Sequence, residues 1–352
     1  LCATDALCLI GFYFNFYRRI NALRLEMQVS NLNTALSSKA YIDELTKVNN
    51  RLFLTENIDK PTENKDDKQT ENKDKNNELS IDYGYAYEQY LRNTFNKNIK
   101  IKTIIYRRVP KDLYSFYECI GVLNDNTIIN TDDVNNLLSV DNKIIITGTG
   151  GIGKSILFKH LFLNSILKTS FIPVLIELRA FNSIEENDLS LKQVIYNNLS
   201  DNGFSLEEKY FDYSIEKGGY IILLDGFDEV NRDKTERVSS EIRSFCNKYN
   251  NNKFIISSRP SDIFIGWNDF VEMTAMSLTK EQALSLIKKI EFDETIKSVF
   301  YEELKNNLYE KYNSFASNPL LLNIMLLTFN NHASIPDKLN DFYEQAFSTL
   351  FN

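Results

Sequence analysis

The chain has 352 residues, 43% of them hydrophobic, so it is long enough for two or three domains with real cores. Its formal net charge of −8 and the lack of a Lys/Arg-rich run argue against direct nucleic-acid binding. Four cysteines without a Cys-x-x-Cys pair and only two histidines argue against a zinc site. Widely spaced cysteines are typical of reduced thiols, so we expect a cytoplasmic protein.

Residues 1–58 are expected to form an N-terminal helical segment. Its apolar run Ala6–Tyr17 is shorter than the ~20 residues that a bilayer span needs. Two interpretations stay open. The run is either the tail of a truncated membrane helix, with Arg18 and Arg19 holding the following chain in the cytoplasm, or a short buried or interfacial helix. Because residue 1 is not Met, we expect the chain to be a fragment.

Asp43–Phe53 resembles the opening helix of a diguanylate cyclase (GGDEF) domain. The Gly-Gly-Asp/Glu-Glu-Phe signature of that family is absent from the chain, so no cyclase activity is predicted. Residues 59–79 follow as a low-complexity linker, in which Thr62–Asp66 recurs as Thr70–Asp74. This linker has almost nothing apolar to offset the entropy of ordering, so we expect it to be disordered.

Residues 80–140 become globular in pattern. Tyr83–Phe95 is typical of an amphipathic helix, and Lys100–Tyr106 of a strand or a helix end. From residue 141 to 278, strands alternate with helices, which predicts an α/β fold with a parallel sheet covered on both faces. The expected strands are Lys143–Thr147, Ile172–Leu178, Gly219–Leu224, Lys253–Ser258 and Phe270–Met276. The expected helices between them are Lys154–Leu167, Leu189–Leu199, Ser205–Glu216 and Lys234–Lys248.

Residues 279–334 are helical in pattern and are expected to form a helical subdomain, with helices at Glu281–Ile290, Thr295–Tyr312 and Leu320–Phe329. Ser205-x-x-Glu208 and Thr279-x-x-Gln282 fit capping boxes that open helices.

The loop after the first strand of the α/β part fits Gly-x-x-x-x-Gly-Lys-Ser, a phosphate-binding (P-loop) motif. Glycines let backbone N–H groups curl around phosphate oxygens, and the N-terminus of the following helix favours negative charge. Lys154 would reach the β- and γ-phosphates, and the Ser155 hydroxyl would be a Mg²⁺ ligand. The motif predicts a nucleoside triphosphate site made of Gly148, Thr149, Gly150, Gly151, Ile152, Gly153, Lys154 and Ser155.

Three acidic residues follow the apolar strand Gly219–Leu224. Asp225, at the carboxyl end of this strand, is expected beside the phosphate loop, where it would hold Mg²⁺ directly or through water. Asp228 and Glu229 are candidates either to polarise an attacking water or to complete the outer shell of the metal. Arg259 follows the next strand, and its guanidinium could sense the γ-phosphate.

Together, Gly148–Ser155, Leu223–Glu229 and Ile256–Pro260 resemble a NACHT domain, from the signal-transducing (STAND) branch of P-loop ATPases. The family occurs in animal inflammasome proteins and bacterial immunity proteins. Ile172–Arg179 and Ser317–Leu322 match further, and the resemblance implies that Pro319 packs near the adenine.

Two flanking segments also resemble bacterial members of this family. Tyr106–Tyr117 is similar to the segment that precedes the NACHT core, and Ile335–Glu344 to the start of a winged-helix domain, expected over residues 335–352. The winged-helix histidine of the family is expected beyond Asn352, so His332 is not assigned that role. A C-terminal repeat sensor for the unknown trigger is likewise expected outside the chain.

The resemblance implies a switch that holds ADP when closed, binds ATP, opens, forms a homo-oligomer and resets by slow hydrolysis. In a prokaryote the implied role is antiviral defence. Other classes stay open from the sequence: an AAA+ motor or other turnover ATPase, a small-molecule kinase, a GTPase, or a scaffold that keeps ADP as a structural ligand.

Overall fold

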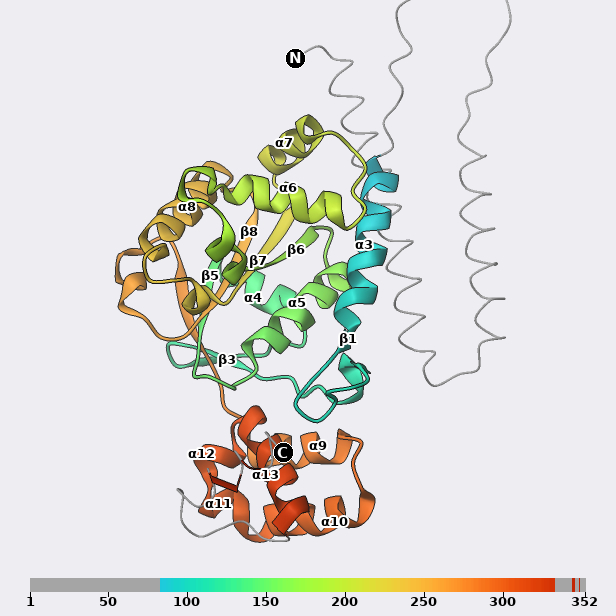
Figure 1. The fold of residues 1–352 in the computed structure, drawn as a ribbon. Coiled ribbons are helices and arrows are strands. Elements are labelled where there is room, and N and C mark those ends of the chain that lie inside the picture. The colour runs from blue at the N-terminus through green and yellow to red at the C-terminus, as the bar shows by residue number, and fades with distance from the viewer. Residues whose placement is uncertain (1–82, 333–343, 346–347, 349–352) are drawn as a thin grey trace, which may run out of the picture. The chain divides into compact units, whose positions relative to one another are not determined.

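The computed structural model describes residues 83–332, 344–345 and 348 (Figure 1). The expected membrane-helix tail, the GGDEF-like segment, the linker at 59–79 and the winged-helix start up to residue 343 lie outside these residues. Contacts within the chain define two units, Leu1–Glu88 and Gln89–Asn352, and the architecture below is that of the second.

A seven-stranded sheet with the order β4-β3-β9-β5-β8-β7-β6 is the centre of the second unit. Five of its strands run parallel: β5 (Lys143–Thr147), β6 (Ile172–Glu177), β7 (Tyr220–Asp225), β8 (Lys253–Ser258) and β9 (Val271–Ala275). The central residues of β5, β7 and β8 are fully buried, as expected for strands covered on both faces, whereas β9 alternates buried and exposed residues. The α/β prediction is therefore confirmed, and β8 lies between the loop-bearing strand β5 and the acid-bearing strand β7.

An antiparallel hairpin that the sequence pattern did not reveal extends this sheet. Its strands, β3 (Val122–Asn124) and β4 (Thr127–Ile129), pair with each other, and β3 also pairs with β9. Three-residue strands are too short to show an alternating hydrophobic pattern, which explains why they were missed.

Helices and short 3₁₀ turns connect the parallel strands (Figure 1). The helices of this part are α4 (Val134–Leu138), α5 (Lys154–Lys168), α6 (Leu191–Asp201), α7 (Glu208–Lys217) and α8 (Thr235–Lys248). The 3₁₀ turns are η1 (Leu113–Ser115), η2 (Leu178–Ser183), η3 (Glu186–Asp188), η4 (Phe227–Glu229) and η5 (Asp262–Gly266). The capping box predicted at Ser205 is wrong, because α7 begins three residues later, after Glu207, with no side-chain cap.

The chain after β9 is helical, as predicted. It forms α9 (Lys280–Lys289), α10 (Glu294–Glu303), the π-helix η6 (Leu304–Leu308), α11 (Tyr309–Lys311), α12 (Asn313–Ala316) and α13 (Pro319–His332). The capping box of Thr279 and Gln282 opens α9 and is confirmed. The single helix expected over Thr295–Tyr312 is instead divided by the π turn. Apolar spacing cannot reveal that turn, since Phe300, Leu304 and Leu308 keep four-residue intervals across it.

Both outer edges of the sheet are protected among the described residues. Helix α3 (Tyr83–Ile99) packs against β6, where the Tyr90 hydroxyl donates to the Pro173 carbonyl at 2.9 Å. Proline has no N–H to offer a further strand, which suits an edge position. The opposite edge, β4, is only three residues long. After α3 come two short paired strands, β1 (Lys100–Ile101) and β2 (Lys111–Asp112), so only the start of the predicted Lys100–Tyr106 element is a strand.

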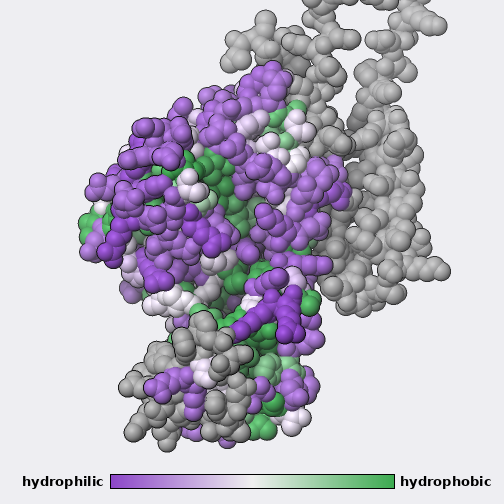
Figure 2. Space-filling view, viewed as in Figure 1, coloured by the Kyte–Doolittle hydropathy of each residue, from purple (hydrophilic) through white to green (hydrophobic). Residues whose placement is uncertain are grey.

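The visible surface of the α/β elements is mostly hydrophilic (Figure 2). Large apolar side chains with more than half of their surface exposed are, in the described part, Val109, Ile128, Ile265 and Val299.

Candidate nucleotide-binding site

The loop between β5 and α5 has the backbone of a phosphate-binding turn. Gly151 and Gly153 adopt φ values of +79° and +98°, in the left-handed region that favours glycine. The Gly148 N–H donates to the Ser258 carbonyl at 3.2 Å, which anchors the loop to the neighbouring strand β8. Helix α5 then begins at Lys154, so its N-terminus faces the same loop.

Lys154 lies against this loop. Its Nζ donates to the Gly148 carbonyl at 2.6 Å and to the Thr149 carbonyl at 3.2 Å. Burial lowers the pKa of Lys154, while the carboxylate of Asp228 raises it. The ammonium group is thus at the position where a phosphate held by the loop would meet it.

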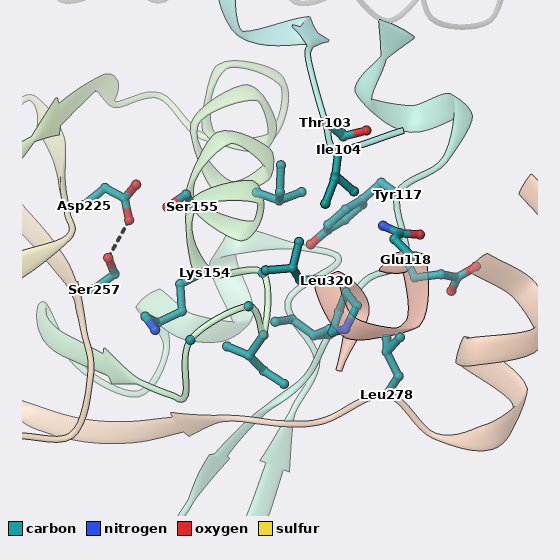
Figure 3. Close-up of a pocket in the computed structure, with 18 of the residues that line it drawn as sticks. Thr103, Ile104, Tyr117, Glu118, Lys154, Ser155, Asp225, Ser257, Leu278 and Leu320 are labelled. Atoms are coloured by element: carbon teal, nitrogen blue, oxygen red, sulfur yellow. Dashed lines mark hydrogen bonds between the residues drawn. The ribbon is translucent and has the colours of Figure 1, made fainter. Parts of the chain in front are cut away.

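Asp225 and Ser155, the two expected Mg²⁺ ligands, lie together at the carboxyl end of the sheet (Figure 3). Ser257, on β8, donates its hydroxyl hydrogen to the Asp225 carboxylate and accepts from the Gly226 N–H at 2.7 Å. Burial raises the pKa of Asp225, and hydrogen bonds from Ser257 and Ser155 lower it. Sequence reasoning missed Ser257 because a serine inside an apolar strand carries no motif of its own.

Hydroxyl and carboxylate oxygens are the donors that Mg²⁺ prefers, so Ser155 and Asp225 fit this ion. Within the described residues, no group of three or more His, Cys, Asp or Glu side chains could hold a metal by itself. Mg²⁺ at Ser155 and Asp225 would therefore share its coordination with phosphate and water, as is usual for this ion.

Asp228 and Glu229 have different surroundings in the structure. The Arg259 Nε lies 2.9 Å from one Asp228 carboxylate oxygen, and the Arg259 backbone N–H donates to the other at 3.0 Å. Both oxygens of Asp228 are thus engaged by Arg259, whose side chain is 67% exposed. The exposed Glu229 lines the same cavity from the end of η4, so it is the freer of the two acids.

A cavity of about 360 Å³ joins this phosphate side to an apolar wall (Figure 3). The volume lies in the usual range of ligand sites. The segment between β1 and β3 and the helical part both contribute to this wall. Its members are Lys102, Thr103, Ile104, Phe116, Tyr117, Glu118, Ile120, Leu278, Leu286, Pro319, Leu320 and Asn323. Sequence reasoning named only Pro319 among them. The resemblance of Tyr106–Tyr117 to the segment that precedes the NACHT core was the one signal for these residues. It did not indicate that they line a cavity.

Contacts from α5 and α9 hold the Tyr117–Cys119 part of this wall. The Tyr117 ring stacks on the buried His160 ring with centroids 4.8 Å apart. Lys289 donates to the Tyr117 carbonyl at 2.8 Å, and Gln282 donates to the Cys119 carbonyl at 2.8 Å. The wall is therefore fixed from two directions.

Pro319 lies at the junction of the wall and the loop. Its Cγ is 4.0 Å from the position that a Cβ on Gly153 would occupy. The preceding residue, Asn318, donates its side-chain amide to the Gly150 carbonyl at 3.0 Å. The start of α13 thus packs directly on the phosphate loop, and Asn318 is a second contact residue that sequence reasoning did not assign.

A family comparison agrees with this geometry. Residues 142–290 match the model of the NACHT domain. This part of the chain is a NACHT domain. The match contains the phosphate loop, Asp225–Glu229 and Arg259, and it ends within the helical part. The expected domain limits at 141–278 and 279–334 stay predictions, as do the roles of the site residues.

Solved structures that resemble this chain share little sequence identity with it. A STAND ATPase with a tetratricopeptide repeat sensor from Pyrococcus horikoshii is 22% identical, with a TM-score of 0.37, over 62% of this chain and 32% of that protein. PCH-2 from C. elegans is 14% identical, with a TM-score of 0.35, over 61% of this chain and 63% of that one. The replication initiator DnaA bound to AMPPCP and single-stranded DNA is 16% identical, with a TM-score of 0.28, over 58% of this chain and 70% of that one.

The chain thus spans about a third of the length of the STAND ATPase and less than two thirds of PCH-2. At these scores we draw no inference from the three structures. No curated protein is significantly similar to the chain. Among the described residues, no helix is both long and apolar enough to cross a bilayer.

Proposed function

We propose that this protein is an ATP- and ADP-binding switch whose nucleotide sits in the 360 Å³ cavity. One observation supports this most directly: the phosphate loop of the NACHT domain and the start of α13 line the same cavity. A nucleotide placed there would contact the α/β part through its phosphates and the helical part through its base. Binding would therefore depend on how the two parts pack, as a switch requires.

The residues of the chain suit Mg²⁺-dependent hydrolysis. The N–H groups of Gly148–Ser155 and the Lys154 ammonium would bind phosphate oxygens, and Ser155 and Asp225 would hold Mg²⁺. When bound, Mg²⁺ would neutralise charge on the β- and γ-phosphates. Glu229 would orient and deprotonate the attacking water, and Asp228 would hold Arg259 beside it.

In this proposal ADP holds the closed monomer, ATP permits opening and homo-oligomerisation, and hydrolysis resets the protein. Inverting a population from 1:99 to 99:1 needs about 5.5 kcal/mol of differential affinity between the two states. The cellular role we propose is antiviral defence in a prokaryote, in which an unknown trigger would start the opening. The family resemblance alone supports that role.

One observation favours a second candidate, a scaffold that keeps ADP without switching. Arg259 is engaged by Asp228 through its side chain and its backbone N–H. The pair uses the Nε of Arg259, so only the two NH₂ groups of its guanidinium would be left to contact a γ-phosphate. If these groups do not contact the γ-phosphate when ATP is bound, the nucleotide would be a structural ligand.

The test is to purify the chain, identify the nucleotide it retains, and measure turnover and mass with Mg²⁺ plus ADP or ATP. We expect retained ADP, turnover well below one per second, and a larger assembly with ATP than with ADP. Retained ADP with no ATP-dependent change in mass would favour the scaffold. Failure to bind either nucleotide, or rapid turnover without a partner, would contradict both candidates.

A further inference from the structure

Asn318 joins the helical part of the chain to the phosphate loop through a nearly buried side chain, 7% exposed. Its Nδ2 donates to the Gly150 carbonyl at 3.0 Å. Its Oδ1 accepts from the backbone N–H groups of Leu320, at 3.1 Å, and Leu321, at 3.2 Å. One end of the amide therefore caps α13, while the other end holds the loop.

The backbone of α13 adds a second contact to the same turn of the loop. The Leu320 N–H also donates to the Gly151 carbonyl, at 3.2 Å. Two consecutive carbonyls of the phosphate loop, those of Gly150 and Gly151, are thus held by the start of one helix.

These two contacts determine the direction of two N–H groups of the loop. A trans peptide is planar, with its C=O and N–H on opposite sides, and none of the described peptides is cis. Because the Gly150 and Gly151 carbonyls point to α13, the N–H groups of Gly151 and Ile152 point away from it. The Ile152 N–H also makes a long contact of 3.4 Å with the Thr149 carbonyl inside the loop, which a phosphate oxygen would replace. Backbone N–H groups of this turn are the ones that bind phosphate oxygens. The orientation of the phosphate donors therefore depends on α13.

Packing at Gly151 leaves no room for a side chain. A Cβ on this residue would lie 2.9 Å from Asn318 Oδ1 and 3.0 Å from the Leu320 Cβ. The glycine is needed for its φ of +79° and also for the close approach of α13.

The turn before Asn318 is tied to the end of the sheet. Leu278, which follows β9, donates its N–H to the Ser317 carbonyl at 2.8 Å and accepts from the Tyr309 hydroxyl at 2.8 Å. Asn318 is thus positioned from both sides, by α13 and by the segment that leaves β9.

The N-terminus of α13 is not itself a second phosphate site. Pro319 has no N–H, and the N–H groups of Leu320, Leu321 and Leu322 all donate to Asn318, the last to its carbonyl at 2.9 Å. These donors are used in holding the loop and the cap.

We propose that Asn318 is a positioning residue that orients the N–H donors of the phosphate loop. Phosphate affinity therefore depends on how the helical part packs against this loop. The inference rests on the proposed function, because it concerns the nucleotide held by that loop.

The test compares two variants that keep a cap with one that removes it. Asn318→Ser retains a capping oxygen but loses the amide donor to Gly150, and Asn318→Asp replaces that donor with an acceptor. Asn318→Ala removes both functions. The exposed Asn306, in η6, provides the matched control Asn306→Ala. For each variant, the dissociation constants of ADP and of pyrophosphate, and the unfolding midpoint without nucleotide, are measured on the full chain.

We expect Asn318→Ser to keep the unfolding midpoint within about 2 °C of the wild type. Its dissociation constants for ADP and pyrophosphate should both rise about tenfold, the effect of one lost hydrogen bond to the loop. Asn318→Asp should weaken both ligands at least as much. Asn318→Ala should also lower the unfolding midpoint, and Asn306→Ala should match the wild type.

Wild-type affinity in Asn318→Ser and Asn318→Asp would overturn the inference while leaving the proposed function intact. A loss of affinity for ADP alone would also overturn the inference, because pyrophosphate would contact the loop and not the apolar wall. A wild-type chain that binds neither ADP nor ATP would refute the proposed function, and this inference with it.

Discussion

The two sides of the cavity are built in different ways (Figure 3). The phosphate side comes from the ends of three strands and one continuous loop. Its charged groups are those of Lys154, Asp225, Asp228, Glu229 and Arg259. The opposite wall is assembled from the segment 102–120 and from residues 278–323, which are far apart in the sequence and mostly apolar. The first side can be recognised from a motif, whereas the second exists only after the chain has folded.

This contrast suggests that the two sides of the cavity have different roles in binding. In the proposed function, the phosphate side would meet only phosphate and metal, which many nucleotides share. The apolar wall is held by contacts with α5, α9 and α13. Its shape therefore depends on how the helical part packs. Variants on the two sides should therefore fail in different ways.

The largest effect is expected from Lys154→Ala on the phosphate side. Loss of a charge-assisted contact to phosphate should weaken ADP, ATP and pyrophosphate alike, by about 100-fold. Titration calorimetry with each ligand measures this. Lys159→Ala, on the same helix, is the control and should bind like the wild type. Unchanged pyrophosphate binding in Lys154→Ala would mean that phosphate is bound elsewhere.

A smaller effect on affinity, but a large one on rate, is expected from Glu229→Gln. Loss of the general base should slow hydrolysis by about 100-fold while ADP affinity changes less than about twofold. Asp228→Asn is the matched variant. It should release Arg259 and slow hydrolysis by only about tenfold. If the two variants exchange these results, Asp228 is the base.

On the opposite wall, Ile104→Ala should weaken ADP by about tenfold, because it removes apolar surface that the base would cover. Pyrophosphate affinity should not change, since Ile104 is remote from the phosphate loop in the sequence and lies on the other side of the cavity (Figure 3). Competition binding with the two ligands distinguishes these effects, and Ile128→Ala at an exposed position of β4 is the control. Equal weakening of both ligands would mean that the two sides are not separable.

The smallest effect is a pH dependence of stability from His160, behind Tyr117. Burial lowers the pKa of His160, although a hydrogen bond to the Thr131 carbonyl and the charge of Asp132 raise it. The folded pKa thus lies below the unfolded value of about 6.5, so the unfolded state binds the proton first as the pH falls. The stability contributed by neutral His160 is present above that value and is lost on acidification.

Urea unfolding of the wild type and His160→Gln at about pH 7.5 and about pH 5.5 measures this effect. The wild type should lose more stability than the variant between the two conditions. Parallel losses would show that His160 does not contribute.

The sequence predicted those parts of the molecule whose physics is local. The phosphate loop follows from glycines and a lysine at fixed spacing, and β5 to β8 follow from their apolar runs. Asp225 follows from its place at a strand end. The β3–β4 hairpin, Ser257 and Asn318 could not be predicted, because each depends on pairing or contacts between distant segments. Ile104 and Tyr117 are ordinary core-forming residue types, and only the fold gives them a cavity to line.

The protected edges of the sheet limit how copies of the chain could assemble. An exposed strand edge is a template on which another chain can add a strand. Here β6 presents Pro173, whose carbonyl is already bound by Tyr90, and β4 offers only three residues. Strand addition is therefore unfavourable at both ends. We expect an assembly formed with ATP to use helices and loops, to dissociate without unfolding the sheet, and to leave the amide-exchange protection of β4 and β6 unchanged.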